Sequence, residues 1–372
     1  MEKKKENAGQ RKKAKVTMTD VAKLAGVSQS TVSIILGNRE SSTFPETTIF
    51  RVLSAANQLG YSYRFAKSTG SKEHKILVAA TNLNNPYYTT MIHAIEMAAY
   101  DTEFDIIIRN TYHDGSREDE LMMDALRQEY DGVLFLYAPD NKELFHTVAK
   151  SMPVISICDS ESRMNTDIVE LDNTLSGKLL TEHLMQLGHR EIGFLTTPHE
   201  GNIIRTMRLK GVQDAMRRAG LIRHLHVFET DKEKRQTVAS FSIPYNEGYQ
   251  LAQRSEIYEK KITALICIND IMAVGVLDYL TERGIHVPRE MSVAGIDNLG
   301  LSGLRQIALT TIDNHMDSVA QSAIDLLFTR IRSKASGQET DKKASGGRFK
   351  AEFTPDLVVR GTTGPCPVEL AN

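Results

Sequence analysis

Residues 17–36, TMTDVAKLAGVSQSTVSIIL, contain two short helical patterns joined at a glycine, and this stretch decides the fold of the first domain. Thr17 can cap the first helix, while Asp20 adds negative charge to its first turn. Gly26 permits a sharp turn because glycine enters left-handed backbone space without steric cost. Ser28 can cap the second helix. The order of caps, turn and apolar faces predicts a helix-turn-helix.

The second of these helices exposes polar side chains on its early turns. Gln29, Ser30, Ser33 and Ile34 fall on the outward side, where a recognition helix presents side chains to base edges. An ordinary helical hairpin is the alternative interpretation of the same pattern. A third helix is expected over residues 45–59, since a proline is tolerated in a first turn.

Charge is distributed unevenly along the chain. The first 75 residues carry 14 Lys and Arg against 6 Asp and Glu, whereas the remainder carries 31 against 41. A basic module joined to an acidic body favours nucleic-acid binding confined to one end. Residues 1–15, with seven basic side chains, predict a disordered arm that attracts phosphate in a salt-sensitive way. A solubilising tail is an equal alternative for this arm.

Length and composition exclude several classes. A chain of 372 residues, 41% hydrophobic and 25% charged, is typical of a globular protein with more than one domain. No apolar run approaches the roughly 20 residues of a membrane span, and no hydrophobic segment follows the basic N-terminus as in a secretory signal. Cys158, Cys267 and Cys366 lack metal-ligand spacing. We therefore expect a cytoplasmic protein without a metal or cofactor.

From residue 75 onward, short apolar runs alternate with amphipathic stretches. The runs predict strands at 76–80, 106–108, 132–136, 154–157, 192–196, 225–229, 264–268 and 292–296. Helices are expected near 88–101, 117–129, 141–151, 174–187, 205–219, 246–255 and 271–284. Repeated strand–helix units imply parallel sheets with right-handed crossovers, here in two doubly wound lobes. Residues 333–349 read as a surface loop, and residues 353–363 as a final strand.

Several motifs together resemble the lactose/galactose-repressor (LacI/GalR) family of bacterial transcription regulators. They are TDVAKLAGVSQSTVS at 19–33, AANQLGY at 55–61, NPYY at 85–88, LGHREIGFLT at 187–196, NDIMAVG at 269–275 and SVAGIDN at 292–298. The resemblance implies a helix-turn-helix domain over 16–61, a hinge over 62–75, and a periplasmic-binding-protein-like core over 76–372. Within that core it implies an N-lobe of about 76–172 and 302–332, and a C-lobe of about 173–301 and 350–363.

The resemblance also assigns roles in DNA binding. Gln29 and Ser30 fall at base-reading positions, and Thr31 and Ser33 lie near phosphate. Ile34 stands where relatives often carry arginine, so it reaches at most a thymine methyl group. Thr17 belongs to the same candidate set. Tyr61 either contacts the DNA backbone or packs against the third helix.

The hinge departs most from the family pattern. Relatives place a leucine there that wedges into the minor groove and kinks the duplex, but Thr69 and Gly70 occupy its place here. The leucine wedge is therefore not expected. Minor-groove or phosphate contact by Arg64 and Lys67 is the more modest expectation.

Effector binding is expected at the carboxyl ends of the strands, in the cleft between the lobes. Tyr87 and Tyr88 can supply a flat aromatic face, and Arg208 and Asp297 match family positions that clamp polar groups of the ligand. Further candidates, each with a structural alternative, come from the ends of other strands. They are Asn269 (or a helix cap), Asp159 (or a loop acid) and Ile243, near a family lid position; Tyr88 is equally a core residue.

Enzyme chemistry lacks support, since no nucleophile elbow, P-loop or metal-spaced cluster is present. The sequence indicates a cytoplasmic, sequence-specific repressor that binds a pseudo-palindromic operator as a homodimer. A sugar or sugar derivative is the expected effector. The alternatives are a catabolite-type regulator with a protein co-effector and a purine-type corepressor. A small-molecule receptor without a DNA role is disfavoured by the helix-turn-helix.

Overall fold

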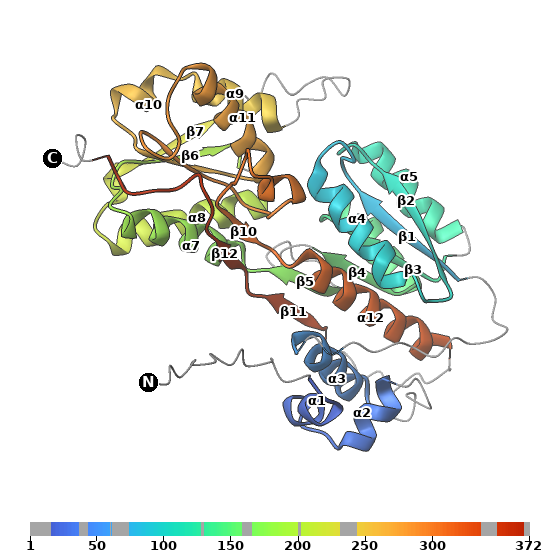
Figure 1. The fold of residues 1–372 in the computed structure, drawn as a ribbon. Helices are drawn as coiled ribbons and strands as arrows, with labels where there is room; N and C mark the ends of the chain where they lie inside the picture. Colours follow the sequence, from blue (N-terminus) through green and yellow to red (C-terminus); the bar gives the residue numbers. More distant parts are fainter. Residues whose placement is uncertain are drawn as a thin grey trace, which may run out of the picture. The chain divides into compact units, whose positions relative to one another are not determined.

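The computed structural model describes residues 16–36, 44–59, 61, 74–127, 130–157, 166–199, 202–230, 244–335 and 348–367. The chain separates into two compact units, Met1–Ser68 and Thr69–Asn372 (Figure 1). The expected basic arm over 1–15 and most of the expected hinge, residues 62–73, lie outside the described residues.

The first unit contains three helices, α1 (Met18–Ala25), α2 (Gln29–Leu36) and α3 (Glu46–Gln58). Thr17 and Asp20 form a reciprocal capping box, in which the Thr17 amide donates to Asp20 Oδ2 over 2.9 Å. These hydrogen bonds hold the pKa of Asp20 below its usual range. Gly26 ends α1 in the left-handed conformation, with φ of 67°.

The start of α2 and the core of this unit follow the sequence pattern. The Ser28 hydroxyl accepts from the Thr31 amide at 3.1 Å, which caps α2. One buried cluster joins the three helices: Val21, Ala22, Ala25, Val32, Ile35, Leu36, Ile49, Val52, Ala55 and Ala56. The predicted helix-turn-helix and the third helix are confirmed.

The first sheet of the second unit defines what we call the N-lobe. Its six parallel strands run in the order β11-β5-β4-β3-β1-β2. Helices α4 and α12 pack against each other on one face, while α5 and α6 contribute to the core beneath the other (Figure 1). The bounds are β1 (His74–Ala80), α4 (Pro86–Ala99), β2 (Phe104–Asn110), α5 (Gly115–Arg127), β3 (Gly132–Phe135), α6 (Lys142–Ser151), β4 (Val154–Ile157), β5 (Asp167–Leu171), α12 (Met316–Ala335) and β11 (Lys350–Phe353).

The second sheet defines the C-lobe. Its four parallel strands run in the order β7-β6-β8-β9, with α7 packed on α8 and α9 packed on α11. The bounds are α7 (Asn173–Gln186), β6 (Ile192–Thr196), α8 (Ile203–Arg218), η3 (Ile222–His224), β7 (Leu225–Glu229), α9 (Pro244–Ala252), α10 (Ser255–Glu259), β8 (Ala264–Cys267), α11 (Asp270–Glu282), β9 (Ser292–Ala294) and η5 (Gly300–Gly303). The expected class, a helical DNA-binding domain followed by doubly wound parallel sheets, is confirmed.

Three crossovers connect the lobes, at residues 171–173, 313–316 and 353–356. Next to the last two crossovers, on the C-lobe side, β10 (Thr311–Asp313) pairs antiparallel with β12 (Asp356–Val358). The expectation of one strand over 353–363 is corrected. The strand is interrupted at Thr354 and Pro355, because proline has no amide hydrogen to donate.

Two expected lobe boundaries are also corrected. Residues 302–312 stay with the C-lobe, because the Gly295 amide donates to the Thr310 carbonyl and Ile312 is buried in the C-lobe core. Residues 350–353 join the N-lobe instead, as β11 pairs with β5. The strands β5 and β11 were not predicted from the sequence, since charged side chains in DIVEL and KAEF interrupt their apolar runs.

His189 fastens the C-terminal segment to the C-lobe. Its Nδ1 lies 2.8 Å from the Thr263 hydroxyl, and its Nε2 lies 3.0 Å from both the Ser292 hydroxyl and the Gly364 carbonyl oxygen. The carbonyl accepts, so Nε2 carries the hydrogen in this arrangement. Burial lowers the pKa of His189 below its usual 6.5.

This buried imidazole predicts a pH-dependent stability. The unfolded chain takes up a proton at His189 more readily than the folded chain, so its contribution to stability is lost as pH falls below 6.5. We expect His189→Gln to flatten that part of the profile. Chemical unfolding of both proteins between pH 5 and 8 measures the difference. Identical slopes would exclude a neutral His189.

Candidate functional site

The candidate DNA-binding residues lie at the start of the first unit. Gln29, Ser30 and Ser33 are exposed on α2, while Thr31 and Ile34 are half-buried. The outward face of α2 is thus available to a groove. Among these side chains, the Ser30 hydroxyl lies 2.7 Å from the Ser28 hydroxyl, so it takes part in the cap of its own helix.

Two further members of the DNA-binding set have structural roles. Thr17 is exposed but engaged in the capping box of α1. Tyr61 packs against the helical core, and its amide donates to the Ala56 carbonyl over 2.8 Å. The packing alternative for Tyr61 is therefore supported. Arg64 and Lys67 lie outside the described residues.

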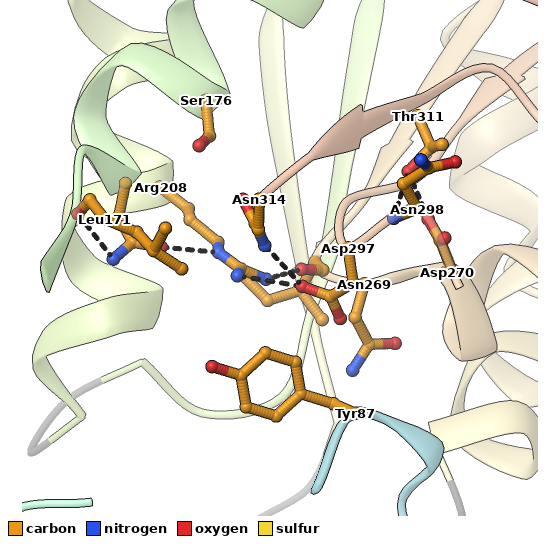
Figure 2. A network of polar contacts seen from close by, with 12 residues as sticks. Tyr87, Leu171, Ser176, Arg208, Asn269, Asp270, Asp297, Asn298, Thr311 and Asn314 are labelled. Atoms are coloured by element: carbon orange, nitrogen blue, oxygen red, sulfur yellow. Dashed lines mark hydrogen bonds and ion pairs between the residues drawn. The ribbon is translucent and has the colours of Figure 1, made fainter. Parts of the chain in front are cut away.

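Arg208 is the centre of a buried polar network in the C-lobe (Figure 2). From the second turn of α8, its guanidinium donates from Nε to Asn173 Oδ1 over 3.0 Å and from one terminal nitrogen to the Ile268 carbonyl over 2.6 Å. The other terminal nitrogen pairs with Asp297 Oδ1 over 3.0 Å. Arg208 is 6% exposed, so these acceptors replace the water that an exposed guanidinium would bind.

Asp297, which lies beyond β9, supplies the counter-charge. Burial raises its pKa to about 7, against the opposite pull of Arg208. The Asn314 side-chain amide also donates to Asp297 Oδ1, over 3.1 Å. Asp297 has φ of 127°, a conformation that non-glycine residues rarely adopt. Such strain is typical of residues held for function.

A second buried carboxylate braces the loop that carries Asp297. Asp270, at the start of α11, accepts from the Ser302 hydroxyl over 2.6 Å, from the Leu299 amide over 2.9 Å and from the Thr311 hydroxyl. Burial raises the pKa of Asp270, and the Ser302 and Thr311 hydrogen bonds oppose that shift. Because these donors follow β9 or lie in β10, the Asp270 carboxylate fixes the loop after β9 against β10.

The remaining described candidates from the sequence lie around this network. The Asn269 side-chain oxygen accepts from the Met272 amide over 2.9 Å, which confirms a helix cap at that position. Tyr87 lies beside Asn269 and the Arg208–Asp297 pair in Figure 2, and meets Tyr88 edge-on, with ring centroids 5.4 Å apart. Burial raises the pKa of the half-buried Tyr88. The charge of Arg205 lowers the pKa of Tyr88, whereas the charge of Asp297 raises it.

Other candidates are not brought to the network. Asp159 and Ile243 lie outside the described residues. Tyr245, two residues after Ile243, donates its hydroxyl to Asp278 on α11. Within the ranges that are described, no group of His, Cys, Asp and Glu side chains is arranged to hold a metal ion. None of the described helices is long and apolar enough to cross a bilayer.

Two residues of this network were not predicted from the sequence. Asn173 is 4% exposed and Asn314 is fully buried. Each follows a strand at a crossover, which is the signal that the sequence offered. This signal could not be used, because the strands β5 and β10 that precede the two asparagines were not predicted.

The geometry defines a class of protein. An exposed recognition-type helix in one unit, and a two-lobed α/β core with buried charges at strand carboxyl ends, are the parts of a ligand-regulated DNA-binding protein.

Comparison with known proteins identifies the family. Residues 17–63 match the model of bacterial regulatory proteins of the lacI family, and residues 181–363 match a periplasmic binding protein-like domain. The HTH-type transcriptional repressor PurR of Haemophilus influenzae (strain PittEE) is 30% identical over 352 residues, covering 92% of this chain and 97% of that repressor. The chain belongs to the LacI family of transcriptional regulators, and it is not an enzyme.

Solved structures share the fold. A LacI family transcriptional regulator from Enterococcus faecium with bound ribose has a TM-score of 0.64 at 22% identity, covering 78% of this chain and 99% of its own. The transcriptional regulator CelR in complex with cellobiose has a TM-score of 0.63 at 19% identity, covering 93% and 99%. At these identities the likeness concerns the fold alone.

Proposed function

We propose that this regulator is a repressor whose operator affinity is set by a small molecule bound beside Arg208 and Asp297, between the two lobes. The buried pair of these two side chains, 3.0 Å apart at the carboxyl ends of the C-lobe strands, carries the proposal. A guanidinium and a carboxylate held in fixed positions can take paired hydroxyl groups of a ligand with charge-assisted hydrogen bonds. Tyr87 adds an aromatic surface near them in Figure 2, and Tyr88 packs edge-on against Tyr87.

A sugar or sugar derivative is the effector that we propose. The two tyrosine rings meet at 84°, so they offer separate faces and no parallel slot. A sugar ring needs one such face and several hydrogen-bonding groups. The ribose and cellobiose found in relatives of the same fold support this choice.

A purine corepressor is the second candidate, favoured by the 30% identity to PurR. A nucleobase gains from stacking on aromatic faces, and Tyr87 and Tyr88 supply these as well. The two candidates differ in the sign of the DNA response. We expect a sugar inducer to release operator DNA, whereas a corepressor strengthens its binding.

A ligand screen tests the effector site. We expect one compound among D-ribose, cellobiose, sugar phosphates, hypoxanthine and guanine to raise the thermal midpoint of the wild-type chain. Arg208→Met should lose at least 100-fold in affinity for that compound, because the guanidinium donors are gone. Isothermal titration measures both affinities. Undiminished binding by the variant would place the effector elsewhere. If no compound raises the thermal midpoint, a protein co-effector would be favoured.

For operator recognition, we propose Gln29 as a base-reading residue. Gln29→Ala should relax base preference at one operator position, at a cost of about 1–3 kcal/mol, because a side-chain amide can contact adenine through two hydrogen bonds. Selection from a randomised DNA library, followed by competition binding, measures this. Lys23→Ala, an exposed change on α1, serves as the control. An unaltered preference would remove Gln29 from the reading set.

We further propose that Ser30 reads bases, that Thr31 and Ser33 lie near phosphate, and that Ile34 touches a thymine methyl. Arg64 and Lys67 would contact the minor groove or phosphate. Thr17 belongs to the same DNA-binding set, whereas for Tyr61 the packing role is favoured. A pseudo-palindromic operator matches a two-fold symmetric reader, so we propose a homodimer acting in the cytoplasm. Light scattering measures the mass of the particle. A monomer bound to a single half-site would refute the dimer.

A further inference from the structure

The Arg208–Asp297 pair is held by asparagines from two different crossovers. Asn173 is the last residue of the crossover at 171–173 and the first of α7, and its Oδ1 accepts from Arg208 Nε over 3.0 Å. Asn314 lies in the crossover at 313–316, and its Nδ2 donates to Asp297 Oδ1 over 3.1 Å. Both asparagines are buried, so neither hydrogen bond competes with bulk water. Figure 2 shows Arg208 and Asn314 both in polar contact with Asp297.

Further hydrogen bonds hold the two crossovers in place. The Asn173 side-chain amide donates to the Leu171 carbonyl over 3.2 Å, at the end of β5. In the same crossover the Asp172 amide donates to the Phe353 carbonyl, at the end of β11. At the second crossover, the Asp297 amide donates to the Ile312 carbonyl over 3.0 Å. A displacement of either crossover therefore changes the hydrogen bonds of the Arg208–Asp297 pair.

We propose that Asn173 and Asn314 are positioning residues that couple the effector site to the lobe crossovers, so that the Arg208–Asp297 pair transmits strain from one crossover to the other. The inference rests on the proposed function, since it assigns regulation to the same site. A ligand that accepts hydrogen bonds from Arg208 or donates one to Asp297 then competes with contacts that hold both crossovers. This differential contact is what a population shift between lobe arrangements requires.

Asn314 leaves the network incompletely satisfied. Its Oδ1 is buried and accepts no hydrogen bond from any residue in the described parts of the chain. A buried acceptor without a partner is costly, so the second crossover is held in an arrangement that a small movement can improve. Exchanging the amide oxygen and nitrogen of Asn314 would not relieve this, because the oxygen would then face the Asp297 carboxylate.

Amide hydrogen exchange on the full chain tests the coupling without effector or DNA. Asn314→Leu keeps the branched shape at Cγ but removes the hydrogen bond to Asp297. We expect exchange at residues 171–175 to accelerate at least tenfold, although no hydrogen bond among the described residues joins Asn314 to that segment. Asn141→Ala removes the cap of α6 and serves as the control for general loss of stability. Acceleration confined to 313–319, or equal acceleration in the control, would overturn the proposal.

The reciprocal test uses a matched pair at Asn173. Asn173→Leu and Asn173→Asp both lose the donor to Leu171, but only the aspartate keeps an acceptor for Arg208 Nε. We expect faster exchange at 313–319 in the leucine variant and wild-type exchange there in the aspartate variant. Equal exchange in both would show that the Arg208 contact carries no coupling. A purely structural role would not separate the pair, and neither outcome bears on the effector screen.

Discussion

Replacing Gly211 with alanine is expected to destabilise the C-lobe by about 3 kcal/mol. A Cβ atom at this position would lie 1.9 Å from the Thr174 carbonyl oxygen and 2.9 Å from the Lys178 amide nitrogen, both in the backbone of α7. Neither atom can move away by a change of rotamer. The two helices must separate, and Arg208, which lies one turn before Gly211 on α8, moves with its helix. Loss of stability and loss of effector binding should therefore appear together.

Chemical unfolding, followed by circular dichroism, measures the effect. Gly115→Ala is the control, because a Cβ at Gly115, where α5 begins, meets no atom within 4 Å. We expect the control to change the free energy of unfolding by less than about 0.5 kcal/mol. Wild-type stability in Gly211→Ala would mean that α7 and α8 do not pack at this distance.

Arg208→Met should destabilise the fold by about 3 kcal/mol at pH 8 and by less at pH 6. The variant leaves the buried Asp297 without its counter-charge. In the wild type, burial raises the pKa of Asp297 to about 7 even though Arg208 opposes the shift. Without Arg208 this pKa rises further, so protonation near pH 6 relieves the unpaired charge whereas pH 8 does not.

The sign of this pH dependence follows from linkage. A carboxyl group whose folded-state pKa is raised stabilises the fold at low pH, and that contribution is lost as pH rises through the folded-state pKa. In the wild type this loss is complete slightly above pH 7. In Arg208→Met it continues to higher pH, so the difference between the two proteins grows above pH 7. His189 titrates in both and cancels from the difference.

The double variant Arg208→Met with Asp297→Asn provides the control, since it has no carboxyl group to titrate at this position. Urea unfolding of the three proteins at pH 6, 7 and 8 gives the comparison. A pH-independent penalty for the single variant would show that Asp297 is not the group left unpaired.

Local signals made much of the fold predictable. Thr17, Gly26 and Ser28 fix the ends of α1 and α2 through contacts within four residues, so their roles could be read in order along the chain. The apolar strands β1, β3, β6 and β8 were equally clear, because strands buried on both faces need few polar residues. Asn269 was weighed as a helix cap for the same local reason.

The helix-turn-helix and the two α/β lobes could thus be predicted from the sequence, which also indicated Arg208 and Asp297 as candidate effector contacts. Only the tertiary structure decided which chain segments belong to which lobe, since β5 and β11 are recognised by their pairing and not by their composition. It also brought Asn173 and Asn314 to the charged pair, across 35 and 17 residues of chain respectively. Contacts at such separations depend on how the strands pair into sheets, and the periodicity of apolar residues along the chain does not predict them.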